Sequence, residues 1–164
     1  AAVDYGLVDA MLTRRADAPL DFDFAKVVEA SKDNPVFYVQ YAHARIRSLQ
    51  RKAAEAGVDA SAPADLDLLD EEELALVKLA AQYPRMVESA AMTHEPHRIA
   101  FYLYDLAAAF HALWNRGNDD PARRFLVEND PQASRARLEL AAGIAQIIRS
   151  GLDLMGVEAA EEMR

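Results

Sequence analysis

Residues 33–45 read DNPVFYVQYAHAR, and this stretch decides the fold. Pro35 stands early in a helical pattern, where the N–H that proline lacks would have no partner inside the helix. Asp33 and Asn34, which precede it, are both of a type that caps helices. The pattern continues to about Ala56, and a glycine follows as a natural stop. We therefore predict one long helix from about Pro35 to Ala56.

Two neighbouring faces of this predicted helix differ in chemistry. One face is apolar, and the face beside it carries Tyr38, Tyr41, Arg45 and Lys52. Tyrosines at the edge of an apolar stripe usually bury their rings and leave the hydroxyl in water, and spacing alone favours this interpretation. Aromatic rings beside cations can instead stack on and neutralise a nucleic acid strand. The apolar stripe itself recurs every three or four positions, as in a helix packed against a core: Val39, Ala42, Ile46, Leu49 and Ala53.

Composition restricts the class of protein. With 164 residues, of which 52% are hydrophobic and 27% charged, the chain is long enough for one globular domain with its own core. Strand-like alternation is almost absent, and there are only 6 glycines and 7 prolines, which favours an all-α protein. The absence of cysteine excludes disulfides and thiolate chemistry. A net charge of -9 opposes non-specific binding to nucleic acid, so any such site must be a local patch.

The rest of the chain predicts further helices with short connections. Residues 117–121, beginning with Gly117, are expected to end the helix before them, and residues 121–130 are expected to form a loop or one short helix. We therefore expect an all-α fold, a helical bundle of five to six helices. Periodic apolar residues, caps and breakers place the further helices at about residues 21–32, 70–82, 83–93, 96–116 and 131–155.

The last two predicted helices have marked patterns. Along residues 96–116, His111 and Asn115 lie on a polar face, and Trp114 lies at the edge of an apolar stripe formed by Ile99, Leu103, Leu106, Phe110 and Leu113. Asp130 is the expected cap of the last helix, and Gly156 with Val157 is expected to end it in the Schellman manner.

The acidic run from Asp70 to Glu73 is expected to be a solvated helix start. Asp70 is a suitable cap, and carboxylates are favourable in the first turn, near the positive end of the helix dipole. The spacing predicts Leu74, Val77 and Ala81 as the buried face of this helix.

No motif in the chain predicts catalysis. There is no nucleophile elbow, no glycine-rich phosphate loop and no metalloprotease signature. His94 and His97, with Glu95, look like part of a metal site, but Pro96 lies between them and spacing fixes no third ligand. We expect these histidines to cap helices and make surface hydrogen bonds, and we expect no metal; a helical metal protein is kept as an alternative.

The stretch at residues 33–45 closely resembles the start of the C-terminal, DALR-type anticodon-binding domain of bacterial arginyl-tRNA synthetase. The resemblance continues through residues 96–107 and covers nearly the whole chain. Further matching segments are Tyr83-Pro84, Phe110-His111, Trp114-Asn115, residues 151–157 and the near-terminal Met163. Residues 117–137 look longer than the usual connection in this family.

This resemblance implies an α-helical bundle that grips the anticodon stem and loop of arginine tRNA. The full enzyme attaches arginine to that tRNA with ATP and magnesium, so ATP is expected for the full-length enzyme and no cofactor is expected in this chain. The catalytic signatures of that enzyme, of His-x-Gly-His and Lys-Met-Ser-Lys type, do not occur here, and we expect the chain alone to be inactive. Residues 1–32 would be the tail of the catalytic domain with a connecting helix, and residues 33–164 the anticodon-binding domain.

The resemblance also implies a set of tRNA-binding residues. Tyr38 and Tyr41 would face the anticodon arm, with Arg45 near its backbone. Trp114, Asn115 and Met163 would help to enclose an anticodon base. Trp114 stands where the family usually has a tyrosine, so it can stack but cannot reproduce the hydrogen bonds of the hydroxyl.

The expected partners are arginine tRNA and the enzyme's own catalytic domain, in a cytoplasmic monomer. We expect neither DNA nor a membrane as partner, and no apolar run reaches the roughly 18 residues that span a bilayer. The alternative is a helical protein–protein interaction module without nucleic-acid binding, which the net charge of -9 favours.

Overall fold

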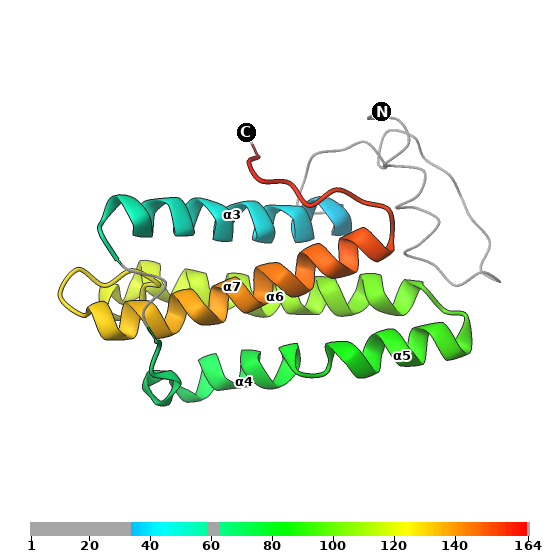
Figure 1. The fold of residues 1–164 in the computed structure, drawn as a ribbon, viewed down its shortest axis with the longest axis horizontal. Helices are drawn as coiled ribbons and strands as arrows, with labels where there is room; N and C mark the ends of the chain where they lie inside the picture. The colour runs from blue at the N-terminus through cyan, green and yellow to red at the C-terminus, as the bar shows by residue number, and fades with distance from the viewer. Residues whose placement is uncertain (1–33, 59–62, 164) are drawn as a thin grey trace.

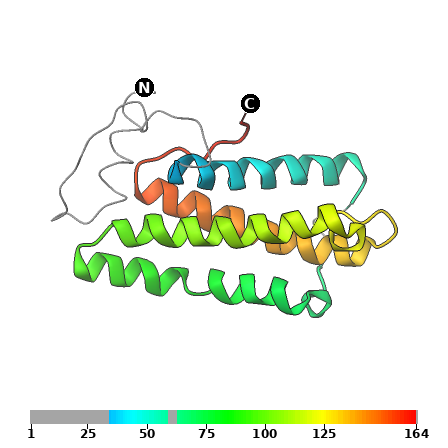
Figure 2. The same cartoon turned by 180° about the vertical axis from the view of Figure 1, so that it is seen from behind.

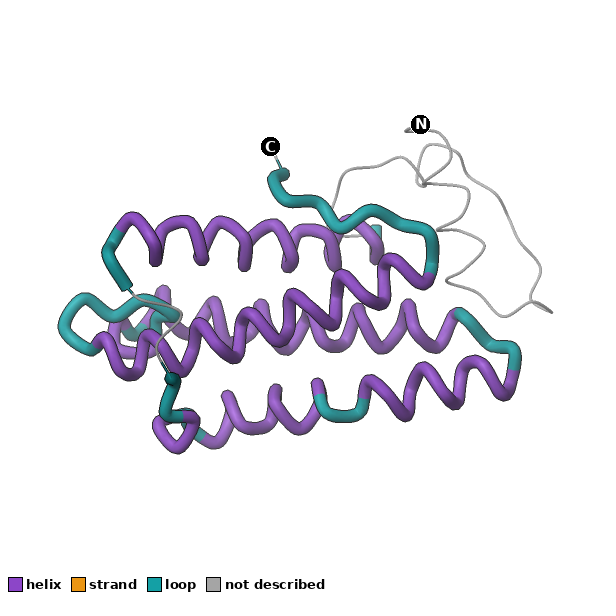
Figure 3. Tube along the Cα trace, in the orientation of Figure 1, coloured by secondary structure: helices purple, strands orange, loops and turns teal. Residues whose placement is uncertain are grey.

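The structure, a computed structural model, describes residues 34–58 and 63–163. Within these ranges the chain is helical and contains no strand (Figures 1 and 3). The predicted helix at residues 21–32 and the predicted tail at residues 1–32 lie outside the described residues. The described α-helices are α3 (Pro35–Glu55), α4 (Glu71–Ala80), α5 (Tyr83–Thr93), α6 (His97–Asp119) and α7 (Pro131–Leu154), with two 3-10 turns, η1 (Leu66–Leu68) and η2 (Pro121–Arg123).

The helices form a bundle in which α6 and α7 occupy the middle. Helix α3 lies along one side of this central pair, and α4 with α5 lies along the opposite side (Figures 1 and 2). Helices α4 and α5 follow one another end to end, with a short interruption between them. The predicted all-α class is therefore confirmed. The predicted number of five to six helices is slightly too high if α4 and α5 are counted as the one interrupted rod that they form.

Helix α3 forms as the sequence predicts. The Asn34 side-chain oxygen accepts hydrogen bonds from the N–H groups of Val36 and Phe37, at 3.1 and 3.3 Å, and so caps the first turn. The helix ends one residue before the predicted position, and Gly57 follows with a φ of 72°, a left-handed conformation that favours glycine. All five residues of the predicted apolar stripe are buried: Val39, Ala42, Ile46, Leu49 and Ala53.

The predicted buried face of α4 is wrong at two of its three positions, because only Val77 is half-buried and packs against the core. Leu74 is 41% exposed and Ala81 is also exposed, whereas Leu76 and Glu73 are almost completely buried. Glu73 closes a capping box with Asp70 and also forms an ion pair with Arg137 of α7, with Nε and Oε1 at 2.7 Å. Because this carboxylate is drawn inward, the helix turns Leu76 to the core and Leu74 to solvent.

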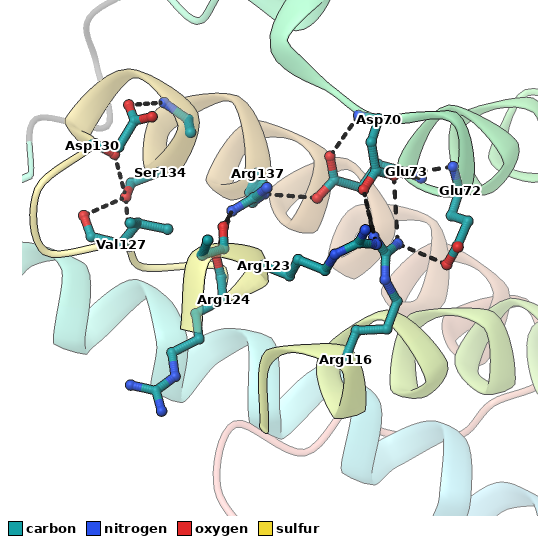
Figure 4. Close-up of polar contacts among 12 residues, drawn as sticks. Asp70, Glu72, Glu73, Arg116, Arg123, Arg124, Val127, Asp130, Ser134 and Arg137 are labelled. Carbon is teal, nitrogen blue, oxygen red and sulfur yellow. Dashed lines mark hydrogen bonds and ion pairs between the residues drawn. The ribbon is translucent and has the colours of Figure 1, made fainter. Parts of the chain in front are cut away.

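A polar network joins α4, α6 and α7 at one end of the bundle (Figure 4). Arg116 of α6 binds Asp70 at 2.5 Å and Glu72 at 2.8 Å. Burial raises the pKa of the Asp70 carboxyl, but the hydrogen bonds from Arg116 and from backbone N–H groups outweigh burial, so the pKa is lowered overall. The acidic run at residues 70–73 is therefore not simply a solvated helix start. We define the polar network as Asp70, Glu72, Glu73, Arg116, Arg123 and Arg137.

Helix α6 continues three residues beyond its predicted end, through Gly117 to Asp119. A Cβ atom on Gly117 would lie 3.0 Å from the Cα of Arg124, which is closer than ordinary packing allows. Glycine at this position lets the segment after the helix pack directly on it. Gly117 is thus a packing residue rather than a helix stop. The predicted apolar stripe of α6 is buried: Ile99, Leu103, Leu106, Phe110 and Leu113.

Helix α7 begins and ends close to the predicted positions. Asp130 caps it by accepting a hydrogen bond from the Ala133 N–H at 2.9 Å. Gly156 follows the helix with a φ of 71°, and the Val157 N–H donates to the Leu152 carbonyl at 2.9 Å, as in the predicted Schellman arrangement. After Val157 the chain turns back toward α3 (Figure 1). None of the described helices is long and apolar enough to cross a membrane.

Candidate nucleic-acid interface

The aromatic face of α3 lies against α6, and His111 of α6 sits between its two tyrosines. The His111 ring centroid lies 4.7 Å from that of Tyr38 and 5.5 Å from that of Tyr41. Tyr38 is half-buried and also contacts Tyr104, with centroids 5.1 Å apart, whereas Tyr41 is 38% exposed. Burial, and then the neighbouring Tyr104, raise the pKa of Tyr38, so its hydroxyl stays protonated. The rings therefore pack, as the spacing favours, and yet border the surface, so contact with nucleic acid stays a prediction.

Arg45 is the centre of this cluster. One terminal nitrogen donates to the Tyr41 hydroxyl at 2.7 Å, and the other donates to Nδ1 of His111 at 3.2 Å. The guanidinium carbon lies 4.6 Å from the centroid of the Tyr41 ring and 4.8 Å from that of Trp114. These are cation–π distances, so the charge is held by neutral groups from both α3 and α6.

His111 is buried and neutral at physiological pH. Burial, followed by the charge of Arg45, lowers its pKa to about 4. Because a guanidinium only donates hydrogen bonds, Nδ1 accepts, and the proton of the neutral ring lies on Nε2. Within the described residues, Nε2 is buried without a hydrogen-bond partner. A neutral imidazole is what lets Arg45 approach so closely.

Trp114 and Asn115 extend the cluster along α6. Trp114 is half-buried, and its ring stacks on Phe125 with centroids 5.7 Å apart and an angle of 27° between the planes. Its other contacts are with Phe110 and Arg45. Asn115 is exposed beside it. The ring of Trp114 therefore belongs partly to the core, as its position at the stripe edge predicts, and partly to the surface that Arg45 occupies.

Residues 158–163, which we call the C-terminal strap, bring Met163 to the same place. The Gln40 amide donates to the Glu158 carbonyl and His43 Nδ1 donates to the Ala160 carbonyl, both at 2.8 Å. Arg47 pairs with Glu161 at 2.6 Å, and Arg51 pairs with Glu162 at 3.4 Å. The hydrogen bond from Arg47 lowers the pKa of Glu161. One side of α3 thus holds the strap along its length.

These residues line two adjoining hollows that share Tyr41, Arg45 and Met163. The first, of about 390 Å³, also contains Tyr38, His111 and Asn115. The second, of about 440 Å³, also reaches Trp114 and Lys52. We call the two hollows together the groove. All six residues that the resemblance implies as tRNA-binding therefore meet at one surface: Tyr38, Tyr41, Arg45, Trp114, Asn115 and Met163.

Sequence reasoning missed the central role of His111, which it placed on a polar face of its helix. A signal was present, because His111 and Asn115 are four residues apart and so share a face of α6. It also missed His43, which is buried and anchors the strap.

The two histidines of the alternative metal site lie apart from this surface. His94 ends α5 in a left-handed conformation, with a φ of 55°, and His97 is buried, with its ring edge against Phe101. Over residues 34–58 and 63–163, no group of three or more His, Cys, Asp or Glu side chains is placed to hold a metal ion. The metal alternative therefore gains no support.

Comparison with known proteins identifies the family. Residues 39–163 match the DALR anticodon binding domain family. The chain belongs to this family. The DALR domain is 65% identical over 153 residues to part of the arginine–tRNA ligase of Novosphingobium aromaticivorans, and 59% identical over 159 residues to part of that of Ruegeria pomeroyi. These matches cover 93% and 94% of the chain but only 26% and 27% of the relatives, so the chain spans about a quarter of their length.

Solved structures agree with the family assignment. The arginyl-tRNA synthetase of Thermus thermophilus superposes with a TM-score of 0.81 and 33% identity, over 97% of this chain and 26% of that one. The resemblance read from the sequence is thereby confirmed as to family and fold.

Proposed function

We propose that the chain is the tRNA-binding domain of an arginine–tRNA ligase and that it recognises the anticodon arm of arginine tRNA. Family membership supports this proposal, since the relatives at 59–65% identity are arginine–tRNA ligases. The observation that carries it is the groove, where Tyr41, Arg45 and Trp114 place aromatic rings and a cation together on an otherwise acidic body. Unpaired loop bases are the usual targets of sequence-specific RNA readers.

In this proposal each groove residue has a distinct task. The rings of Tyr41 and Trp114 stack on anticodon bases, and each stacked base contributes roughly 1–3 kcal/mol. The Asn115 amide, which is exposed beside them, can hydrogen-bond to the edge of a base. Met163 covers the base as an adaptable apolar side chain. Arg45 holds the two rings apart and presents its positive charge to the RNA backbone.

The activity of the whole enzyme belongs to the same proposal. That enzyme would join arginine to its tRNA with ATP and magnesium, in the cytoplasm and as a monomer. The residues present do not fit ATP, because the chain has neither a glycine-rich phosphate loop nor the family's catalytic signatures. In this proposal the DALR domain contributes recognition, and its second partner is the catalytic domain of the same enzyme.

Binding of arginine tRNA to the 164-residue chain tests the proposal. Fluorescence anisotropy at low salt, where phosphate contacts are strongest, should show saturable binding to an arginine tRNA transcript. A transcript with a replaced anticodon loop is the matched control and should bind more weakly. Absence of binding at low salt would contradict the proposal.

Replacing Tyr41 tests the groove itself. Tyr41→Ala should weaken binding about thirtyfold, which corresponds to about 2 kcal/mol, the middle of the range expected for one stacked base. It should leave the fold intact, because Tyr41 is 38% exposed. Circular dichroism during thermal unfolding provides the check. A variant that unfolds would show that the ring belongs to the core and not to the binding surface.

The alternative function, a helical protein–protein interaction module, keeps two observations in its favour. The net charge is -9, and Met92 and Phe101 are 77% and 53% exposed. If arginine tRNA fails to bind, this alternative becomes the better account of the chain.

A further inference from the structure

The groove does not end at Trp114. A third hollow, of about 410 Å³, adjoins the second and shares Lys52 and Trp114 with it. Its other wall comes from the segment after α6, through Gly117, Asn118, Arg124 and Phe125. The three hollows thus follow one another along α3 and α6, with Tyr41 and Arg45 joining the first two and Lys52 and Trp114 joining the last two.

The segment that builds this third hollow is fixed in place. Gly117 lets the backbone at Arg124 pack directly on α6, and the Arg124 Nε donates to the Gly117 carbonyl at 3.0 Å. Phe125 is buried and stacks on Trp114. On the far side, Arg137 donates to the carbonyls of Ala122 and Arg124, each at 2.8 Å. The wall is therefore a structured surface beside the stacking site.

The arginines near this wall differ in whether a carboxylate neutralises their charge. Arg116, Arg123 and Arg137 all pair with carboxylates of the polar network. Arg124 points away from that network, toward α3, and pairs with no carboxylate of the described residues (Figure 4). The Lys52 side chain is exposed and makes no hydrogen bond or ion pair with the described part of the chain. Two uncompensated cations therefore face the third hollow from opposite walls.

Acidic side chains decide where along the groove a phosphate can lie. Glu162 borders the second hollow, where it pairs with Arg51 and would repel a phosphate. Among the described residues, no carboxylate borders the third hollow. On a chain with a net charge of -9, an RNA backbone can bind only where cations lie without neighbouring carboxylates, as they do here.

We propose that the third hollow is a phosphate-binding subsite, in which Lys52 and Arg124 contact the RNA backbone next to the base stacked at Tyr41 and Trp114. This inference rests on the proposed function and adds the residues 117–126 to the binding surface. It gives the connection after α6, which looks long for the family, a role in binding.

The test measures the affinity for a fluorescent arginine tRNA transcript over a salt series. Lys52→Ala and Arg124→Ala should each weaken binding about three- to tenfold at low salt. Each should also reduce the slope of log affinity against log salt by about 0.7, the value for one single-strand phosphate contact. Lys78→Ala is the matched control, because Lys78 is an exposed lysine of α4 that borders none of the three hollows and removes the same charge.

Two outcomes overturn the inference in distinguishable ways. If wild type binds and Tyr41→Ala weakens binding, while Lys52→Ala and Arg124→Ala behave as Lys78→Ala does, the subsite is wrong and the proposed function stands. If wild type does not bind, both are wrong. Should Arg124→Ala lower the melting temperature, Arg124→Gln keeps a donor for the Gly117 carbonyl, and with Lys52→Ala it decides the question.

Discussion

Arg137 and Arg45 each join two helices, but they are held in opposite ways. Arg137 is buried against the Glu73 carboxylate at 2.7 Å, so its charge is cancelled within the polar network. Arg45 is held by a hydroxyl, a neutral imidazole and two aromatic rings, and none of these carries a charge. An arginine can therefore be positioned firmly and still present its net charge to a ligand, provided that its protein partners are neutral.

The largest expected effect comes from breaking the network. Glu73→Ala leaves the Arg137 guanidinium buried without its carboxylate, and loss of one partner of a buried pair costs about 3–5 kcal/mol. Urea unfolding followed by circular dichroism measures this change in the free energy of unfolding. Glu72→Ala is the control, since Glu72 is largely exposed and its pair should contribute at most about 1 kcal/mol. Equal effects of the two variants would show that the Glu73 pair is not the buried anchor described.

A smaller effect tests the neutral state of His111. In the unfolded chain this histidine takes up a proton near pH 6.5, whereas in the fold its pKa is about 4. Between these values the unfolded state binds more protons, so the free energy of unfolding falls as the pH falls, by at most about 1.4 kcal/mol per pH unit.

His111→Gln keeps an acceptor for Arg45 but does not titrate. Urea unfolding at pH 7 and pH 5 should therefore show a steeper loss of stability for wild type than for this variant. Parallel losses would mean that His111 does not carry the pH dependence.

The smallest effect separates charge from shape at Arg45. Arg45→Lys keeps the positive charge but loses the planar group that stacks on Tyr41 and Trp114. The loss should be about 1 kcal/mol in the binding of arginine tRNA, or roughly fivefold in affinity. Arg47→Lys is the matched control on another side of α3, where a lysine can keep the exposed ion pair with Glu161. Unchanged affinity of Arg45→Lys would show that charge alone suffices.

The sequence predicted those parts of the fold that depend on local chemistry. The caps at Asn34, Asp70 and Asp130, and the glycine turn at Gly156, act within a few residues of themselves, so their positions could be read directly. The face of α4 could not be read in this way. It depends on Arg137, which lies 64 residues beyond Glu73. Gly117 was misread for the same reason, because its close neighbour is Arg124 of the following segment.

The groove was predicted through the resemblance rather than through spacing. Periodicity placed Tyr38 and Tyr41 beside a core stripe and favoured simple packing. It could not place Arg45 against Trp114, because these residues come from different helices. The burial of His111 likewise depends on side chains of α3, which no pattern within α6 reveals.

The C-terminal strap makes the groove sensitive to loss of the last few described residues. The buried apolar residues of the described bundle all precede residue 158, so a bundle without the strap would leave His43, Arg47 and Arg51 uncovered. A product that stops before residue 158, whether by early termination or by proteolysis, would keep its buried core. Its groove would lack Met163. Such a product would pass a test of folding and fail a test of RNA binding, so only the second assay reports on the integrity of this domain.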